Sequence, residues 1–316
     1  YRGGTRSSRL QPAPDPETIR NRVEFLGKAY AAGSKAFEDD VTAKEAIKDY
    51  NYLVYAAAQR LSSEKGIPPG STDYMAFVEG KGDEIGVVYE LWKETRQWSL
   101  DYFESIYKRV GTHYDRYYFE SECLSGVDRA RDAVKQGILK ESDGAVVFDG
   151  TPYGLHTRVF VNSLGLPTYE GKELALSATQ SVEFGKLDKL IHVLGPEQLS
   201  FTAVTFKAEE LLGIFPPGVQ YHLAYGWVRL KKGKMSSRLG NVVLGESLLD
   251  SVKQKIYNIL DKNISDPKSA QLPQYAQSEK DTIAEAAAIA AVKYSFLRVS
   301  VHQEIAFDID ESINFE

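Results

Sequence analysis

Apolar side chains in the first third of the chain recur every three to four residues, the period of an amphipathic helix. The clearest stripe runs from Asp83 to Val110 and consists of Ile85, Val88, Trp92, Thr95, Trp98, Tyr102 and Ile106. Gly111 follows this stripe directly. Because glycine adopts the left-handed conformation of a C-terminal cap without strain, it favours a helix end there. The spacing predicts one long helix over 83–110.

Two more helices are predicted before it. Asp15 followed by Pro16 predicts an N-cap and a first turn. Thr42 and Glu45 have the spacing of a capping box. The helix that opens at Thr42 would bury one face, made of Ile47, Tyr50, Val54, Ala58 and Leu61. We therefore expect residues 15–112 to be mainly helical.

From about Tyr114 the pattern changes to short apolar runs between helices. We expect strands at 114–119, 144–148, 157–162, 187–194 and 221–230, and helices at 126–135, 168–181, 197–212 and 246–260. Strands that alternate with helices through short connections are typical of a parallel sheet with crossover helices, an α/β fold. Ligands bind beyond the carboxyl ends of such strands. In this chain two of the predicted strands end at Leu194 and Leu230, so we expect a ligand near the residues that follow them.

The remaining segments are predicted to be connections and a C-terminal helical segment. We expect a loosely ordered stretch over 1–14, a loop over 65–72 and a linker over 267–273. The residues at 283–299 predict a strongly apolar helix. It is long enough to pack in a bundle but shorter than the ~20 residues that cross a membrane.

The composition is typical of a soluble folded protein, with 316 residues, 43% hydrophobic and 26% charged. A net charge of −6 argues against a chain that is basic throughout, although a local basic face could still meet nucleic acid. The single cysteine, Cys123, excludes an internal disulfide and favours a reducing compartment. No signal peptide or membrane span is visible, so we expect a cytoplasmic protein. A start at Tyr1 indicates a fragment.

The loop over 231–240, KKGKMSSRLG, carries the most chemistry. Lys234 lies between two glycines and is followed by the hydroxyls of Ser236 and Ser237 and by Arg238. A mobile backbone with cationic and hydroxyl donors can hold a polyphosphate. The alternative is a solvated basic turn.

The run Lys-Met-Ser-Ser-Arg closely resembles the second motif of class I aminoacyl-tRNA synthetases. Three other stretches resemble the arginyl-tRNA synthetase family in particular: 162–176 its Thr-Tyr-x-x-x-Asp segment, 193–208 its Gly-x-x-Gln turn, and 291–316 the opening helices of its tRNA-contacting domain. The likeness covers about 98–316 and extends weakly back to about Arg20. Two features depart from the family. No His-x-Gly-His motif is present, and Glu173 stands where the family usually has aspartate.

The resemblance implies an arginine pocket. Tyr169 would contact the substrate, Glu173 would face its guanidinium group, and Gln198 would line the pocket. Tyr169 and Glu173 are four residues apart, hence on one helix face, and a carboxylate is the group that accepts two parallel bonds from arginine. The alternatives are a core tyrosine, a solvated surface glutamate and a polar residue at a helix start.

The resemblance also implies an ATP site. Gly226 and Val228 would hold the adenine, Met235 and Lys234 would complete the nucleotide site, and Lys234, Ser236 and Ser237 would bind the leaving pyrophosphate. The alternative is an ordinary structural role, since Gly226 and Val228 would also suit any strand. Magnesium is expected to share the phosphate charge, and the residues indicate no dedicated metal-binding set.

The expected partners are L-arginine, ATP and tRNA(Arg), with no membrane and a monomer favoured. A basic cluster that includes Arg229, Lys231 and Lys232 could reach toward tRNA, although such clusters are often only solvated. The helix at 283–299 would begin the anticodon-reading bundle, most of which is absent.

The resemblance divides the chain into a loosely ordered stretch at 1–14, a helical insertion at 15–112, the C-terminal half of a Rossmann-like catalytic domain at 113–262, and a linker with the start of the anticodon-binding domain at 263–316. Since half of the nucleotide site would be missing, we expect the fragment alone to be inactive. Two alternatives stay open: a non-catalytic arginine or tRNA sensor, and a nucleotidyltransferase that adenylates a small acid without tRNA.

Overall fold

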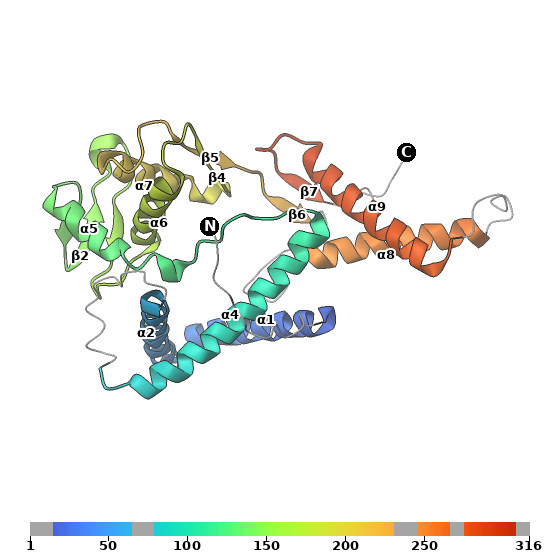
Figure 1. The fold of residues 1–316 in the computed structure, drawn as a ribbon, viewed down its shortest axis with the longest axis horizontal. Helices are drawn as coiled ribbons and strands as arrows, with labels where there is room; N and C mark the ends of the chain where they lie inside the picture. Colours follow the sequence, from blue (N-terminus) through green and yellow to red (C-terminus); the bar gives the residue numbers. More distant parts are fainter. Residues whose placement is uncertain (1–14, 65–78, 231–244, 266–274, 308–316) are drawn as a thin grey trace, which may run out of the picture.

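The structure is a computed structural model that describes residues 15–64, 79–230, 245–265 and 275–307. Figure 1 shows an α/β lobe, a pair of long helices that extends away from it, and a group of N-terminal helices along one side. Helix α4, Gly82–Val110, belongs to the N-terminal group and runs from the other helices of that group to the extended pair. The expected combination of helical and α/β segments is confirmed.

The N-terminal helices are α1, Pro16–Asp39, α2, Val41–Glu64, and α4. Their ends follow local rules. Asp15 accepts a 3.0 Å bond from the Thr18 N–H, as predicted for an N-cap. Gly111 ends α4 with φ of 68°, also as predicted. The capping box at Thr42 is wrong. Asp40 caps α2 instead, because its carboxylate accepts bonds from the N–H groups of Thr42 and Ala43.

The buried face of α2 differs in part from the predicted one. Tyr50 is 62% exposed, whereas Leu53, Ala56 and Ala57 are buried. Leu53 and Ala56 form a small core with Leu166 of the α/β lobe. The prediction that Tyr50 is buried is wrong, because α2 packs against both the other N-terminal helices and the α/β lobe, and the periodicity of α2 alone does not identify these neighbours.

The α/β lobe begins with α5, Gly126–Lys135, and the strands β1, Lys140–Ser142, β2, Ala145–Phe148, and β3, Arg158–Val161. These strands form an antiparallel sheet in the order β1-β2-β3, so the parallel arrangement expected here is wrong. The β1–β2 connection is a turn at Asp143 and Gly144, with φ of 50° and 76°, too short for a crossover. Residues 114–119 form no strand, because the rings of Tyr114, Tyr117 and Phe119 contact one another in irregular chain.

Helix α6, Tyr169–Phe184, packs closely on α5. A Cβ atom on Gly126 would lie 1.9 Å from the Gly171 carbonyl oxygen, so this crossing requires glycine. The main core lies among α5, β2, β3, α6 and α7, and includes Val127, Phe148, Phe160, Leu174 and Val204.

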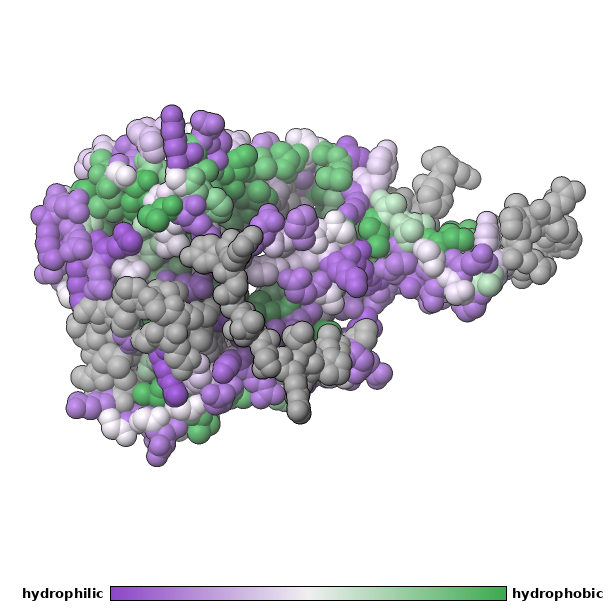
Figure 2. Space-filling view, viewed as in Figure 1, coloured by the Kyte–Doolittle hydropathy of each residue, from purple (hydrophilic) through white to green (hydrophobic). Residues whose placement is uncertain are grey.

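The predicted crossover is present between β4, Leu190–Leu194, and β5, Gln220–Ala224, which are parallel and joined through α7, Leu199–Leu211. Strand β4 is not buried on both faces as predicted, since Ile191 is 54% and Val193 60% exposed. Figure 2 shows apolar residues gathered along the edge of the molecule over α7 and these strands.

The predicted strand at 221–230 is divided. Beyond β5, the chain passes through an irregular stretch into β6, Val228–Leu230, which pairs in parallel with β7, Ile305–Phe307. Helices α8, Gly245–Ser265, and α9, Gln277–Leu297, share a second core with this pair, which includes Val252, Ala288 and Phe307. Within the described ranges, no helix is long and apolar enough to cross a membrane.

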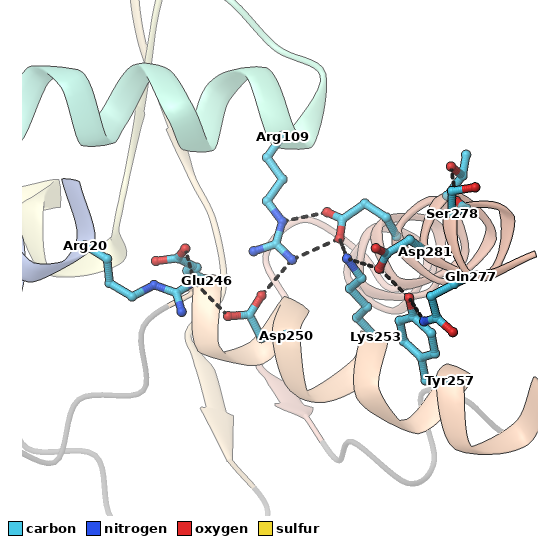
Figure 3. A network of polar contacts seen from close by, with 11 residues as sticks. Arg20, Arg109, Glu246, Asp250, Lys253, Tyr257, Gln277, Ser278 and Asp281 are labelled. Carbon is cyan, nitrogen blue, oxygen red and sulfur yellow. Dashed lines mark hydrogen bonds and ion pairs between the residues drawn. The ribbon is translucent and has the colours of Figure 1, made fainter. Parts of the chain in front are cut away.

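A polar network ties α4 to the extended helices (Figure 3). Arg109, near the end of α4, contacts Glu285 of α9 at 2.6 Å and Asp250 of α8 at 2.8 Å. Lys253 reaches Glu285 and Asp281 from α8. The network joins segments that are far apart in sequence. The four sequence-based domain limits stay a prediction.

Candidate functional site

The start of α6 is fixed by local hydrogen bonds. Asn162 accepts bonds of 3.0 Å from the N–H groups of both Leu164 and Leu166 and so closes the turn before the helix. Thr168 is the N-cap, as predicted, and its hydroxyl accepts from the Gly171 N–H at 3.4 Å. Tyr169 then stands in the first turn with 71% of its surface exposed. This tyrosine is free to meet a ligand.

Glu173 lies one turn further along α6, on the same side as Tyr169, and is partly buried. Burial raises the pKa of its carboxyl group to about 7. Two other acids, on α6 and α7, have cationic partners: Glu170 pairs with Arg158 at 2.9 Å, and Glu210 with Lys207 at 3.1 Å. Among the described residues Glu173 forms no ion pair. It is therefore an acid that a cation would stabilise.

Gln198 is exposed at the turn into α7. His222 of β5 steadies that turn, since its Nε2 lies 3.2 Å from the Leu194 carbonyl oxygen and its Nδ1 lies 2.8 Å from the Thr202 hydroxyl. Helices α6 and α7 pack side by side. Within the described part of the chain, the Gln198 side chain forms no hydrogen bond with Glu173.

A polar layer lies between α7 and the β4–β5 pair, and it was not predicted from the sequence. Glu209 of α7 is fully buried, Gln220 donates a 2.7 Å bond to it, and His192 lies 3.1 Å from Gln220. The one signal is that α7 is apolar on most sides, which favours burial of one of its two adjacent acids, Glu209 or Glu210. That signal narrows the buried acid to two residues and does not identify its partners.

Gly226 and Val228 are held by the C-terminal part of the chain. A Cβ atom on Gly226 would lie 2.0 Å from the Gln303 carbonyl oxygen, and the Gly226 N–H donates to Val301 O at 2.8 Å. Val228 pairs with Ile305 and packs against the second core. These contacts give both residues a structural reason, and their part in adenine binding stays a prediction.

Lys234, Met235, Ser236 and Ser237 lie outside the described residues, as do Lys231, Lys232 and Arg238. Arg229 does lie in the described part and forms a 3.1 Å ion pair with Glu304 on the surface. In the described ranges, no group of three or more His, Cys, Asp or Glu side chains is placed so that it could hold a metal ion.

Comparison with known proteins gives a consistent picture. Residues 26–309 match the family model of tRNA synthetases class I (R), catalytic domain. The chain is 29% identical to an arginine–tRNA ligase of Flavobacterium psychrophilum, covering 95% of this chain and 48% of that protein. It is 28% identical to the arginine–tRNA ligase of Treponema denticola, covering 94% and 50%. The chain thus spans about half the length of these relatives.

The fold is similar to solved structures. Arginyl-tRNA synthetase of Thermus thermophilus gives a TM-score of 0.57 at 20% identity, covering 77% of this chain and 46% of that one. Arginyl-tRNA synthetase of Plasmodium falciparum also gives 0.57, at 16% identity, covering 77% and 39%. With the family model matched over most of its length, the chain belongs to the class I arginyl-tRNA synthetase catalytic-domain family.

Proposed function

We propose that this chain is part of an arginine–tRNA ligase, which activates L-arginine with ATP and transfers it to tRNA(Arg). The observation that supports this most is the Glu173 carboxyl group, which is partly buried, has no cationic partner among the described residues, and lies one turn after the exposed Tyr169. Arginine carries a planar cation whose parallel N–H groups match a carboxylate. Gln198 would add a polar contact from the start of α7.

The reaction needs no nucleophilic side chain. The carboxylate of arginine attacks the α-phosphate of ATP, a mixed anhydride forms, and pyrophosphate leaves. A hydroxyl of the terminal ribose of tRNA then attacks the arginyl carbonyl, and AMP leaves. The protein aligns the reactants and stabilises charge on the departing phosphates. We assign the phosphate role to Lys234, Ser236 and Ser237, and the nucleotide contacts to Gly226, Val228 and Met235.

Magnesium has no protein site that fits it in the described ranges, because no cluster of three or more potential ligands is found there. Mg²⁺ that takes part would be bound mainly through the phosphates of ATP, its usual mode with nucleotides. We therefore assign no step to a protein-held metal ion.

The tRNA partner would meet the α8–α9 end of the molecule. Arg229 is a weaker candidate for this contact, since Glu304 already pairs with it. The buried Cys123 agrees with a reducing compartment, and we propose a cytoplasmic monomer. Elution of the purified chain as a dimer in size-exclusion chromatography would contradict the monomer.

Arginine-dependent ATP–pyrophosphate exchange in the presence of tRNA(Arg) tests the function. The assay uses a protein of the same length as the relatives, in which this chain is accompanied by the segments that the relatives have in addition. Glu173→Gln should raise the KM for arginine about 30-fold or more and leave the KM for ATP unchanged, because losing one partner of a desolvated charge pair costs about 2–5 kcal/mol. Glu210→Gln changes the α7 acid that pairs with Lys207; it is the matched control and should behave as wild type.

No exchange with arginine under these conditions would remove the ligase activity. Exchange with arginine that does not require Glu173 would remove its role in the pocket. For the 316 residues alone we expect no exchange, and measurable tRNA-dependent exchange by this chain would contradict that expectation.

A further inference from the structure

Glu209 is a fully buried acid on α7, and its carboxyl group joins that helix to β5 directly and to β4 through Gln220. Gln220 Nε2 on β5 donates a 2.7 Å bond to Glu209 Oε2, and Gln220 Oε1 lies 3.1 Å from His192 Nε2 on β4. Because an amide oxygen only accepts, His192 carries a proton on Nε2. One oxygen of Glu209 is thus fixed by a directed chain of bonds.

The other Glu209 oxygen has no bond of this kind to any described residue. Oε1 is buried with no hydrogen-bond partner in the described structure, and so is the hydroxyl of Ser177, one turn beyond Glu173. The hydroxyl lies close enough to lower the pKa of the Glu209 carboxyl group, whereas the charge of Glu173 raises it. Ser177 and Glu173 therefore act on Glu209 from the same helix.

Within the described ranges, no cation balances these two acids. Burial is the largest cause that raises the pKa of Glu209 well above its ordinary value, and Glu173 adds to it. The titratable groups around the pair supply no positive charge that would offset this. Burial lowers the pKa of His192, Cys123 has a pKa raised to about 12 by burial, and His222 is hydrogen-bonded to α7 and β4. Two buried carboxylates without a counter-ion do not both ionise near neutral pH.

We propose that Glu209 is a positioning residue of the arginine site that stays in its neutral acid form. Glu173 and Glu209 together then carry one negative charge, which matches the single positive charge of one guanidinium group. The inference rests on the proposed function, which gives Glu173 its guanidinium partner. As an acid, Glu209 still accepts from Gln220 at Oε2, and protonation removes the charge that the buried Oε1, which has no partner in the described structure, would otherwise share. As a carboxylate, Glu209 would stay an unpaired buried charge after a monocation had bound Glu173.

Carbon NMR of the 316-residue chain with ¹³C-labelled glutamate carboxyl groups tests this. Glu173→Gln and Glu209→Gln assign the two signals. We expect Glu209 to stay in the acid form at neutral pH while Glu173 titrates with a midpoint of about 7. Glu209→Gln keeps the neutral charge and should leave the Glu173 midpoint in place, whereas Glu173→Gln should lower the Glu209 midpoint.

A carboxylate signal for Glu209 at neutral pH contradicts the proposal. So does a Glu173 midpoint that falls by about 1 unit in Glu209→Gln, since that shift reports the removal of a like charge. Where a variant fails to fold, through-bond correlation of each carboxyl carbon to its own backbone assigns the signals in the wild-type chain.

Adding L-arginine to the same samples separates the two levels of the inference, with L-citrulline as the neutral isostere. Arginine should lower the Glu173 midpoint by about 1–3 units, the effect of an adjacent cation, and should leave Glu209 in the acid form. Citrulline should shift neither. If Glu209 becomes a carboxylate when arginine binds, the proposal for Glu209 is wrong, whereas the arginine-binding role of Glu173 stands. If arginine moves neither signal, the role of Glu173 fails and Glu209 loses its part in the site with it.

Discussion

The guanidinium group of Arg109, near the end of α4, lies 2.6 Å from the carboxylate of Glu285 on α9, although the two residues are 176 positions apart. A second carboxylate, Asp250 of α8, lies 2.8 Å from the same group. One side chain thereby connects the N-terminal helices to the C-terminal pair. We expect these two ion pairs of Arg109 to make a measurable contribution to the stability of the fold.

Arg109→Ala should lower the free energy of unfolding by about 1.5–3 kcal/mol, because hydrogen bonds to charged groups are worth that much when they are largely shielded from water. Only 18% of the Arg109 side chain is exposed. Arg20 contacts Asp250 and Glu246 but is 51% exposed, so Arg20→Ala should cost less than about 1 kcal/mol. Urea unfolding of both variants measures the difference. Equal losses would show that burial of Arg109 does not matter.

The same contact should depend on pH in one direction. The hydrogen bond from Arg109 is the main cause that lowers the pKa of Glu285 below its ordinary value of 4.5 in the folded chain. A depressed acid stabilises the fold above its unfolded pKa and loses that contribution as pH falls through the folded pKa. The stability difference between wild type and Arg109→Ala should therefore shrink below pH 4.5. A difference that is constant into acid would remove this assignment.

Glu173 should have the opposite effect on stability. Its folded pKa of about 7 lies above the ordinary 4.5, so the folded state pays an increasing penalty as pH rises between these values. Glu173→Gln should therefore stabilise the chain by up to about 3 kcal/mol above pH 7 and change little near pH 4.5. Thermal unfolding at both pH values checks this. A variant that is less stable than wild type at high pH would mean that the carboxylate is already paired.

Gly226 and Gly86 should respond oppositely to alanine. At Gly226 the new Cβ atom would lie 2.0 Å from the Gln303 carbonyl oxygen, so the irregular stretch between β5 and β6 must shift. At Gly86, within α4, nothing lies within 4 Å of the added atom. Gly86→Ala should stabilise the chain by about 0.8–1 kcal/mol, the helix propensity difference. Gly226→Ala should lower the melting temperature, and equal melting temperatures would contradict the close contact.

Local chemistry predicted the features that depend on a few adjacent residues. Asp15, Thr168 and Gly111 each act as the caps that their side chains or backbone favour, and α5 begins and ends at the predicted residues. The hydrogen bonds that end a helix are made within one turn, so the sequence holds the whole interaction. The parallel pairing of β4 and β5 followed from the short connections on either side of α7.

Features set by distant contacts could not be predicted in the same way. The exposure of Tyr50 depends on where α4 and Leu166 lie, and the break between β5 and β6 depends on the backbone near Val301 and Gln303. Antiparallel pairing of β1, β2 and β3 replaced the expected crossovers because a tight turn joins the first two strands. In the candidate site, Tyr169 and Glu173 followed from one motif, whereas Glu209 acquires its meaning from partners on another helix and two strands.

The affinity of the protein for L-arginine across neutral pH tests the central claim most directly. In the proposed arginine site, guanidinium binding requires the ionised form of Glu173, and burial raises the pKa of this carboxyl group to about 7. The dissociation constant should therefore rise about tenfold for each pH unit below 7 and level off above it, as proton linkage requires. Calorimetric titration from pH 5.5 to 8.5 measures this, with Glu173→Gln as the control that binds weakly throughout. An affinity that is the same at every pH, or that survives Glu173→Gln unchanged, would mean that Glu173 does not hold the arginine.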